Sequence, residues 1–266
     1  EDQAAGQRGS PGSSLTVRNA KRVLAVRGRF SGIYPSPLRG VLFDLDDTLL
    51  DHRGAVDEAL ARWRRLEGFD IAYQLLRERW LELETTYYRR FQAGELTKAE
   101  QRRARIRALL PQRELNDVEA DLAFGRYWAA YVDAWRAFPD ALSALDRARQ
   151  AGLATGILTN GDGDDQRRKV VAAGIAATGV PVFASSELPA AKPDPRAFTT
   201  ACTRLGVRPE HCLVVGDSLE NDVSGARAAS MPVVLLDRYA RHLAVDVPRI
   251  SSLDELRFQP PPIRSA

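Results

Sequence analysis

The chain has 266 residues, 44% of them hydrophobic and 27% charged, which is typical of a globular protein and excludes a mostly disordered or fibrous one. No apolar run approaches the roughly 18 residues of a membrane span, and the two cysteines, Cys202 and Cys212, form neither a disulfide framework nor a metal-binding motif. The formal charge of +3 comes from residues 1–39, where seven Lys or Arg face only Glu1 and Asp2, so the rest is slightly acidic and a nucleic-acid partner is not expected.

The two ends of the chain are predicted to be disordered. Residues 1–39 form a basic leader whose first part is rich in Gly, Ser and Gln, and residues 257–266 form a proline-rich tail. The leader combines no long apolar stretch with a small-residue cleavage site, so a secretory signal is not predicted and the cytoplasm is the expected location. An Arg-rich targeting or docking segment is the alternative interpretation of the leader.

Between these ends, apolar runs of strand length alternate with helical patterns. The predicted strands lie at 41–46, 153–159, 182–185, 212–216 and 233–237. Helical patterns follow several of them, at 164–173, 194–205 and 220–229. This alternation predicts an α/β fold, a Rossmann-like core in which a parallel sheet carries helices on its faces.

Residues 52–137 interrupt that alternation with helical periodicity and no convincing strand. They are predicted to form an inserted all-helical cap domain of four or five helices, which leaves 40–51 and 138–256 as the core. The insertion carries sixteen Lys or Arg against fourteen Asp or Glu. Its clustered arginines are therefore expected to form a solvated face rather than to contact an anionic substrate; they are Arg102, Arg103, Arg105 and Arg107.

Aromatic residues of the insertion are expected to form its core rather than a substrate platform. The neighbouring His52 is expected at the surface of the hinge, and a position at the entrance to the site is the alternative. The aromatic residues include Trp63, Trp80, Tyr87 and Trp128.

The strongest motif follows the first predicted strand and reads Asp44-Leu-Asp46-Asp47-Thr48. Because side chains alternate along a strand, Asp44 and Asp46 are expected to point the same way. Ligands bind open α/β sheets at the carboxyl ends of the strands, so two carboxylates here indicate a site. A cluster of acids that caps the next helix is the alternative.

Three further strand ends carry polar groups. Thr159, Asn160 and Gly161 offer a hydroxyl and turn amides, a ready anion site or a plain helix N-cap. Lys192 precedes Pro193 and offers one ammonium group, or a solvated surface lysine. Gly216-Asp217 ends another strand, and Asp222 follows five residues later, where a metal ligand and a helix N-terminal charge are equally compatible with the pattern.

The order of these four motifs resembles the haloacid dehalogenase-like hydrolase superfamily, in particular its phosphatase-type branch with a helical cap inserted after the first motif. The resemblance covers about residues 40–240. It implies that Asp44 is the nucleophile, which forms an aspartyl-phosphate, and that Asp46 is the general acid/base. The backbone carbonyl of Asp46 would also bind the metal.

The same resemblance assigns the remaining motif residues. Thr159 and the amide of Asn160 would hold the phosphoryl group, and Lys192 would neutralise the phosphoryl and nucleophile oxygens. Asp217 would bind Mg²⁺, and Asp222 would bind it or orient its waters. The charges agree with this, because four ionised aspartates against Lys192 and Mg²⁺ leave an excess of negative charge. Like charges are therefore expected to raise the pKa of Asp46 and keep it protonated.

We expect the substrate to be a small-molecule phosphate ester, with no membrane partner. Dehalogenation is disfavoured because family members that dehalogenate lack the second acid, here Asp46. A sugar phosphomutase, another phosphoryl-transfer member of the superfamily and a non-catalytic phosphate-binding regulatory protein are the alternatives. Lys98, the one lysine of the insertion, has no support as a Schiff-base residue for phosphonate cleavage. The sequence predicts neither the physiological substrate nor the oligomeric state.

Overall fold

The computed structural model describes residues 38–258, so the predicted leader and tail fall almost wholly outside the described residues. A parallel six-stranded sheet in the order β3-β2-β1-β4-β5-β6 lies at the centre of the core. Its strands are β1 Gly40–Phe43, β2 Ala154–Thr159, β3 Val182–Ala184, β4 Cys212–Gly216, β5 Val233–Leu236 and β6 Arg249–Ile250. The predicted α/β fold is confirmed, and the two-residue edge strand β6 adds to the five predicted strands.

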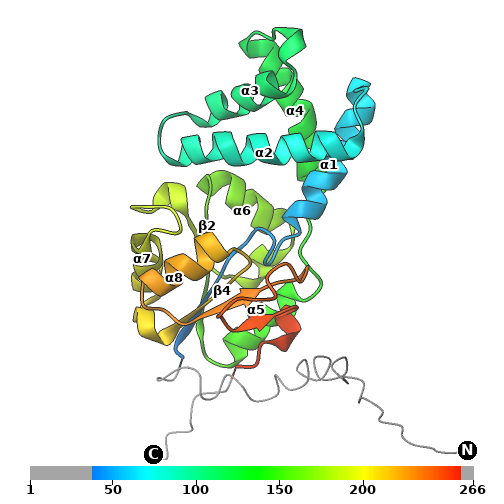
Figure 1. The fold of residues 1–266 in the computed structure, drawn as a ribbon. Coiled ribbons are helices and arrows are strands. Elements are labelled where there is room, and N and C mark those ends of the chain that lie inside the picture. The colour runs from blue at the N-terminus through cyan, green and yellow to red at the C-terminus, as the bar shows by residue number, and fades with distance from the viewer. Residues whose placement is uncertain (1–37, 259–266) are drawn as a thin grey trace, which may run out of the picture. The chain divides into compact units, whose positions relative to one another are not determined.

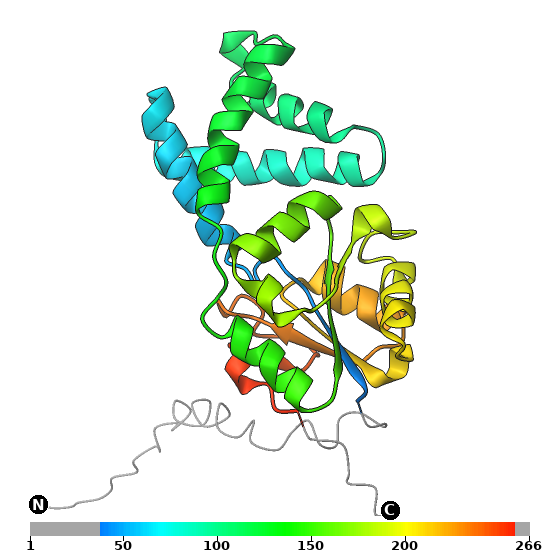
Figure 2. The ribbon, with the colours of Figure 1, turned by 180° about the vertical axis from the view of Figure 1, so that it is seen from behind.

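Helices cover the faces of this sheet (Figures 1 and 2). They are α5 Ala141–Gln150, α6 Gly163–Ala172, α7 Pro195–Leu205 and the short α8 Gly225–Ala228, which a π-helical turn at Leu219–Ser224 precedes. Short 3-10 turns lie at Pro111–Arg113, Ile175–Thr178, Ser185–Glu187, Pro209–His211 and Leu253–Glu255. The central strands are buried on both faces, which is why they read as unbroken apolar runs in the sequence.

One hydrophobic cluster joins α7 and α8 to the sheet. Phe198 of α7 and Ala226 of α8 pack with Leu42 of β1 and Val214 of β4, all of them buried. Residues at i and i+2 of a strand share a face, so the alternate residues Val41 and Phe43 are left for the opposite face. Both faces of the first strand are therefore fixed by packing, and the chain leaves β1 in a defined direction.

The insertion consists of α1 His52–Glu67, α2 Tyr73–Gln92, α3 Lys98–Leu109 and α4 Asp117–Asp133. Its centre is aromatic: the Trp80 ring lies 5.6 Å from Trp63 and 4.3 Å from Tyr127, between ring centroids, and Trp63 and Trp80 are fully buried. Thr97 and Asn116 begin α3 and α4 with capping boxes, in which side chain and backbone bond reciprocally. The insertion thus has a core of its own.

Two chain segments join the insertion to the sheet, and they bond to each other. The backbone N–H of Asp51 donates to the carbonyl of Arg136 over 3.0 Å, and the N–H of Phe138 donates to the carbonyl of Leu49 over 2.9 Å. Both connections therefore leave the core together, beside the end of β1 (Figure 1). Within residues 38–258, no helix is long and apolar enough to cross a membrane.

Candidate active site

The carboxyl edge of the sheet gathers the polar residues that the motifs single out. Asp44 directly follows β1, Thr159 ends β2 and Asp217 directly follows β4. Lys192 comes from the loop between β3 and α7. Because the strands are parallel, four segments that are far apart in the chain converge at this edge.

Lys192 links two of the aspartates. Its Nζ donates to Asp44 Oδ1 and to Asp222 Oδ1, each over 2.6 Å, and its side chain is 3% exposed. The side chain of Asn160 fixes the Lys192 backbone: Nδ2 donates to the Lys192 carbonyl and Oδ1 accepts from the Lys192 N–H, both over 2.8 Å. The second motif therefore positions the lysine of the third, a role of the Asn160 side chain that the sequence analysis missed.

The turn after Asn160 requires glycine. Gly161 has a φ of +150°, and a Cβ there would collide with Gln166 and approach the Tyr88 hydroxyl within 2.9 Å. This lack of a side chain lets Tyr88 of the insertion donate to the carbonyl of Asn160 over 3.3 Å. The anion-binding turn expected at this strand end is thus in direct contact with α2.

Three carboxylates form a compact group beside Lys192. Asp44, Asp217 and Asp222 each offer an oxygen, and these oxygens lie within 4.8 Å of one another. Asp222 is almost fully buried and accepts from the backbone N–H of Ser218 over 3.0 Å. Gly216 makes room for it, because a Cβ at that position would overlap the Asp222 carboxylate.

The ionisation of this group fits a bound dication. Burial raises the pKa of Asp44 to about 7, since the neighbouring Asp222 and Asp46 reinforce it and Lys192 only partly offsets it. Burial likewise raises the pKa of Asp217 to about 8, with the charges of Asp44 and Asp222 adding to the rise. Three crowded oxygen donors, two of which have raised pKa values, suit a hard cation such as Mg²⁺, which the sequence analysis predicts here.

Asp46 lies outside that group. The predicted strand 41–46 ends at Phe43, so the alternation of a strand does not extend to Asp46, and the chain turns directly after it at Asp47, which has a φ of +62°. Both oxygens of Asp46 accept from Nζ of Lys169, over 2.8 and 2.7 Å. Lys169 belongs to α6 and is buried. The two acids of the first motif thus contact different lysines.

The expected rise in the pKa of Asp46 is wrong for this structure. Burial does act to raise it, but the charges of Lys169 and then His52 outweigh that effect and hold the pKa below its ordinary value. The expectation considered only the other aspartates and Lys192, because no sequence signal places Lys169 against Asp46.

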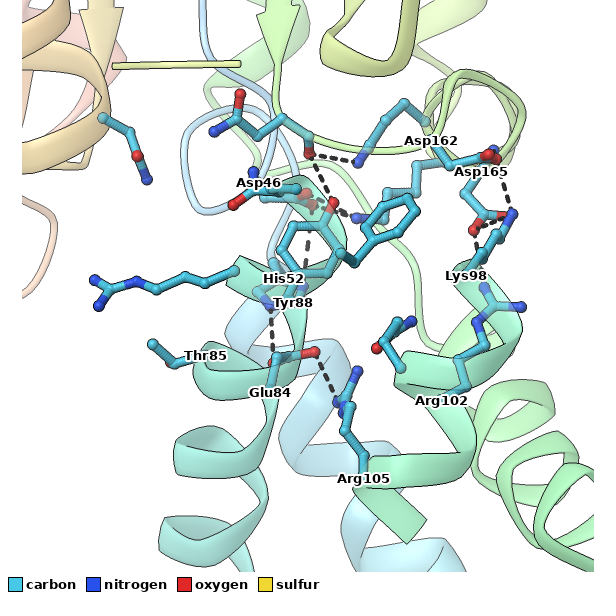
Figure 3. A pocket seen from close by; sticks show the side chains of 18 of the residues that line it. Asp46, His52, Glu84, Thr85, Tyr88, Lys98, Arg102, Arg105, Asp162 and Asp165 are labelled. Carbon is cyan, nitrogen blue, oxygen red and sulfur yellow. Dashed lines mark hydrogen bonds and ion pairs between the residues drawn. The ribbon is translucent and has the colours of Figure 1, made fainter. Parts of the chain in front are cut away.

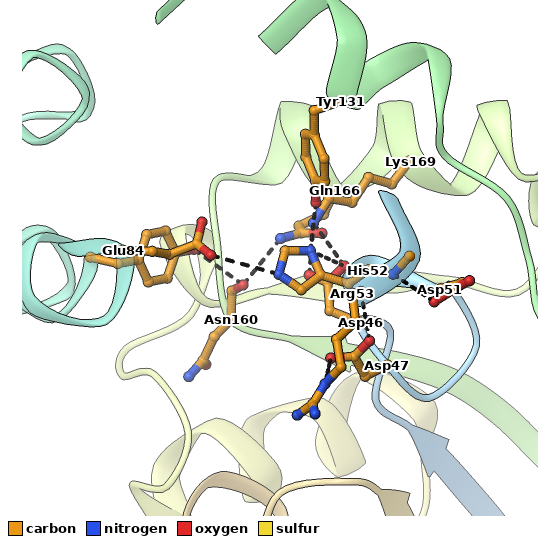
Figure 4. A network of polar contacts seen from close by, with 12 residues as sticks. Asp46, Asp47, Asp51, His52, Arg53, Glu84, Tyr131, Asn160, Gln166 and Lys169 are labelled. Atoms are coloured by element: carbon orange, nitrogen blue, oxygen red, sulfur yellow. Dashed lines mark hydrogen bonds and ion pairs between the residues drawn. The ribbon is translucent and has the colours of Figure 1, made fainter. Parts of the chain in front are cut away.

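A polar network continues from Asp46 into the insertion (Figure 4). His52 Nδ1 lies 4.0 Å from Asp46 Oδ1 and shares a hydrogen bond of 2.7 Å with the Tyr131 hydroxyl. His52 Nε2 lies 3.9 Å from Glu84 Oε2, and Glu84 Oε1 accepts from Arg105 over 2.9 Å. His52 therefore connects the first motif with the insertion, rather than lying on the surface of the hinge.

This network borders a cavity of about 520 Å³ between the insertion and the sheet edge (Figure 3). Arg102 and Arg105 line it, and Arg105 is 4% exposed, so the expectation of a solvated arginine face is wrong for these two residues. Arg103 instead bonds to Asp117 and Asp121 on α4, away from the residues that line the cavity. Trp128, predicted as core, also lines the cavity, whereas Trp63 and Trp80 are core residues as expected.

A family model matches most of this chain. The model describes a haloacid dehalogenase-like hydrolase and matches residues 38–230. The protein therefore belongs to the haloacid dehalogenase-like hydrolase family.

Individual relatives differ in how much of the chain they share. A glyceraldehyde 3-phosphate phosphatase of Methanopyrus kandleri is 32% identical over 209 residues, which are 76% of this chain and 84% of the relative. A phosphoserine phosphatase of Thermus thermophilus is 45% identical, but over only 104 residues, 39% of this chain and 42% of the relative. The fold matches that of the HAD-hydrolase YfnB from Bacillus subtilis, solved with magnesium bound, with a TM-score of 0.68 at 22% identity over 83% of this chain and 97% of that one. Dehalogenases also occur among the similar proteins.

Proposed function

We propose that the protein is a Mg²⁺-dependent phosphatase that hydrolyses a small-molecule phosphomonoester through an aspartyl-phosphate intermediate. The main support is the contact of Lys192 with Asp44 and Asp222, beside Asp217, at the ends of the parallel strands. The phosphatase names of relatives such as those from Methanopyrus and Thermus support the same reaction. We also propose the cytoplasm as its location, which the free thiols of Cys202 and Cys212 fit.

In the first step, a carboxylate oxygen of Asp44 attacks phosphorus, and the bond between phosphorus and the leaving oxygen breaks. Lys192 neutralises charge on the attacked group, and the Thr159 hydroxyl with the N–H of Asn160 donates to the phosphoryl oxygens. Asp46 gives its proton to the leaving oxygen. Since Lys169 favours the ionised form of Asp46, the substrate has to displace Lys169 from at least one Asp46 oxygen before this transfer.

In the second step, Asp46 accepts a proton from water, whose oxygen attacks phosphorus and releases inorganic phosphate from Asp44. Asp44, Asp217 and Asp222, with the backbone carbonyl of Asp46, would hold the Mg²⁺. When bound, the ion supplies positive charge against the phosphoryl oxygens and the crowded carboxylates.

The proposal is tested by hydrolysis of p-nitrophenyl phosphate by the full chain, with Mg²⁺ and with excess EDTA. Turnover should require the metal, and Asp44→Asn should lower it by at least about 10³-fold, as expected for loss of a nucleophile. Asp146→Asn is the matched control, because Asp146 is 56% exposed on α5. Undiminished activity in EDTA or in Asp44→Asn, or halide release from 2-chloropropionate without any phosphate release from esters, would contradict the proposal.

A further inference from the structure

The cavity beside the candidate catalytic residues is larger than a phosphoryl group requires. Its volume of about 520 Å³ falls in the range of pockets that hold a small organic molecule. Its walls come from the insertion on one side and from the strand ends on the other (Figure 3). The part beyond Asp46 is therefore where the organic portion of a phosphate ester would lie.

The positive charges that line this cavity are compensated by carboxylates, one of which, Asp165, contacts both Lys98 and Arg102. Among the described residues, each Lys or Arg that lines it bonds to a carboxylate. The pairs are Arg89–Glu220 at 3.2 Å, Lys98–Asp162 at 2.8 Å, Arg102–Asp165 at 2.9 Å, Arg105–Glu84 at 2.9 Å, Lys169–Asp46 at 2.7 Å and Lys192–Asp44 at 2.6 Å. In every pair except Lys192–Asp44, the carboxylate also lines the cavity. A second anionic group on the substrate would therefore meet no cation that lacks a partner.

Glu84 contributes most to this compensation on the side of the insertion. It bonds to Arg105 and lies 3.9 Å from Nε2 of His52 (Figure 3). Arg105 is buried and stacks 4.3 Å above the ring of Trp80, so water screens its charge poorly and Glu84 supplies the compensation instead. A carboxylate on the substrate would have to compete with Glu84 for Arg105.

We infer that the enzyme selects phosphate esters whose organic portion carries no negative charge, such as polyols and sugars, and that Glu84 is a residue that determines this specificity. The inference rests on the proposed function. Removing the charge of Glu84 leaves Arg105 without its carboxylate partner. That arginine then becomes available to an anionic substrate, so Glu84→Gln should relax the selectivity.

Glycerol 3-phosphate and 3-phosphoglycerate test the inference, because they differ only in having a hydroxymethyl group or a carboxylate. With Mg²⁺, the kcat/KM of the wild-type protein should be at least about tenfold higher for glycerol 3-phosphate than for 3-phosphoglycerate. The reason is that the carboxylate of 3-phosphoglycerate enters the cavity without gaining a favourable contact with a cation. Glu84→Gln should move this ratio at least about tenfold toward 3-phosphoglycerate. Glu82→Gln is the control, since Glu82 lies on the same helix, is 65% exposed and pairs with Arg79.

The outcomes separate the two proposals. An enzyme that hydrolyses p-nitrophenyl phosphate in an Asp44-dependent way but uses 3-phosphoglycerate as well as glycerol 3-phosphate would overturn the inference alone. A ratio that does not move in Glu84→Gln, with the aryl phosphatase activity retained as a sign of folding, would overturn the role of Glu84. A protein that hydrolyses none of the three esters would overturn the proposed function, and the inference with it.

Discussion

The strand-end site and the wall of the cavity between the insertion and the core handle their charges differently. At the strand ends, Lys192 bonds two of three crowded aspartates, and among the described residues Arg241 stands 3.7 Å from the third, Asp217. In the cavity wall, each Lys or Arg contacts a carboxylate: Arg105 contacts Glu84 of the insertion, whereas Lys98 and Arg102 contact acids at the start of α6 and share one of them, Asp165. The first arrangement resists full ionisation without a further cation, whereas in the second every positive side chain already has a carboxylate partner. Metal binding is thus expected to depend on the strand ends, and discrimination between substrates on the insertion.

The sharpest test of this division is to loosen the insertion and leave the sheet intact. Trp80 is fully buried among Trp63, Phe124 and Tyr127, so Trp80→Ala should cost about 3–5 kcal/mol of the stability of the insertion. Amide hydrogen exchange should rise in α1 to α4 and stay slow in β1 and β4, while Mg²⁺ still binds.

Phe198→Ala is the counterpart in the core, because Phe198 is fully buried under the sheet. A similar loss of stability is expected there, with faster exchange in the strands and weaker Mg²⁺ binding. If Trp80→Ala weakened Mg²⁺ binding as much as Phe198→Ala does, the insertion and the strand-end site would not be separable in this way.

A smaller effect is expected where the two regions meet, at the contact of Lys169 with Asp46. Lys169→Met removes both hydrogen bonds to Asp46, so kcat should fall by about 10- to 100-fold, part of what a general acid/base contributes. The pKa of Asp46 should rise when the lysine charge is lost, so any limb of the pH–rate profile that reports Asp46 should move to higher pH.

Lys169→Arg should restore much of kcat, because it returns a positive charge at the same position. Arg168→Met is the neutral control, since Arg168 is exposed on the same helix. A wild-type kcat and an unmoved pH profile in Lys169→Met would show that Lys169 serves only packing.

Three residues of the strand-end site could be located from the sequence because they stand at the ends of apolar runs of strand length. Asp44, Thr159 and Asp217 stand at such ends, and a parallel sheet brings these ends to one edge whatever the details of packing. Lys192 was also expected near a strand end, but β3 ends at Ala184 and Lys192 lies in the loop that follows; only the resemblance gave it a role at the site. The helical character of 52–137 was equally readable from periodicity.

The contacts across the cavity could not be read in the same way. The ion pair of Lys169 with Asp46 spans 123 positions and depends on how α6 docks, and Lys169 stands in a helical pattern like any charged residue. Likewise, nothing in the run of arginines separates Arg105, which faces Glu84, from Arg103, which bonds to Asp117 at the surface. The helix α5 and the edge strand β6 were also missed, because β6 is only two residues long and α5 follows the insertion without a strand before it.

The smallest and most specific effect concerns the pH dependence of metal binding at the strand ends. In the folded protein without metal, the pKa of Asp44 is raised to about 7 and that of Asp217 to about 8, whereas the ordinary pKa of an aspartate is 3.8. At a pH between these values the folded protein therefore holds protons that the unfolded chain has already lost. The stability from these two groups is thus fully present below about pH 4 and disappears as the pH rises through 7 and 8. Mg²⁺ has to displace these protons, so its dissociation constant should fall by about tenfold or more from pH 6 to pH 8.5.

Calorimetric titration with Mg²⁺ at pH 6 in buffers of different ionisation enthalpy measures the protons that binding releases. More than one proton per ion is expected for the wild-type protein, and about one fewer for Asp217→Asn, since its amide does not titrate. Glu84→Gln should leave the proton release unchanged, because Glu84 belongs to the cavity wall and not to the carboxylate group. A Mg²⁺ affinity that stays constant from pH 6 to pH 8.5 would mean that the aspartates at the strand ends are already ionised, and the contrast between a charge-crowded strand-end site and a charge-compensated cavity wall would fail.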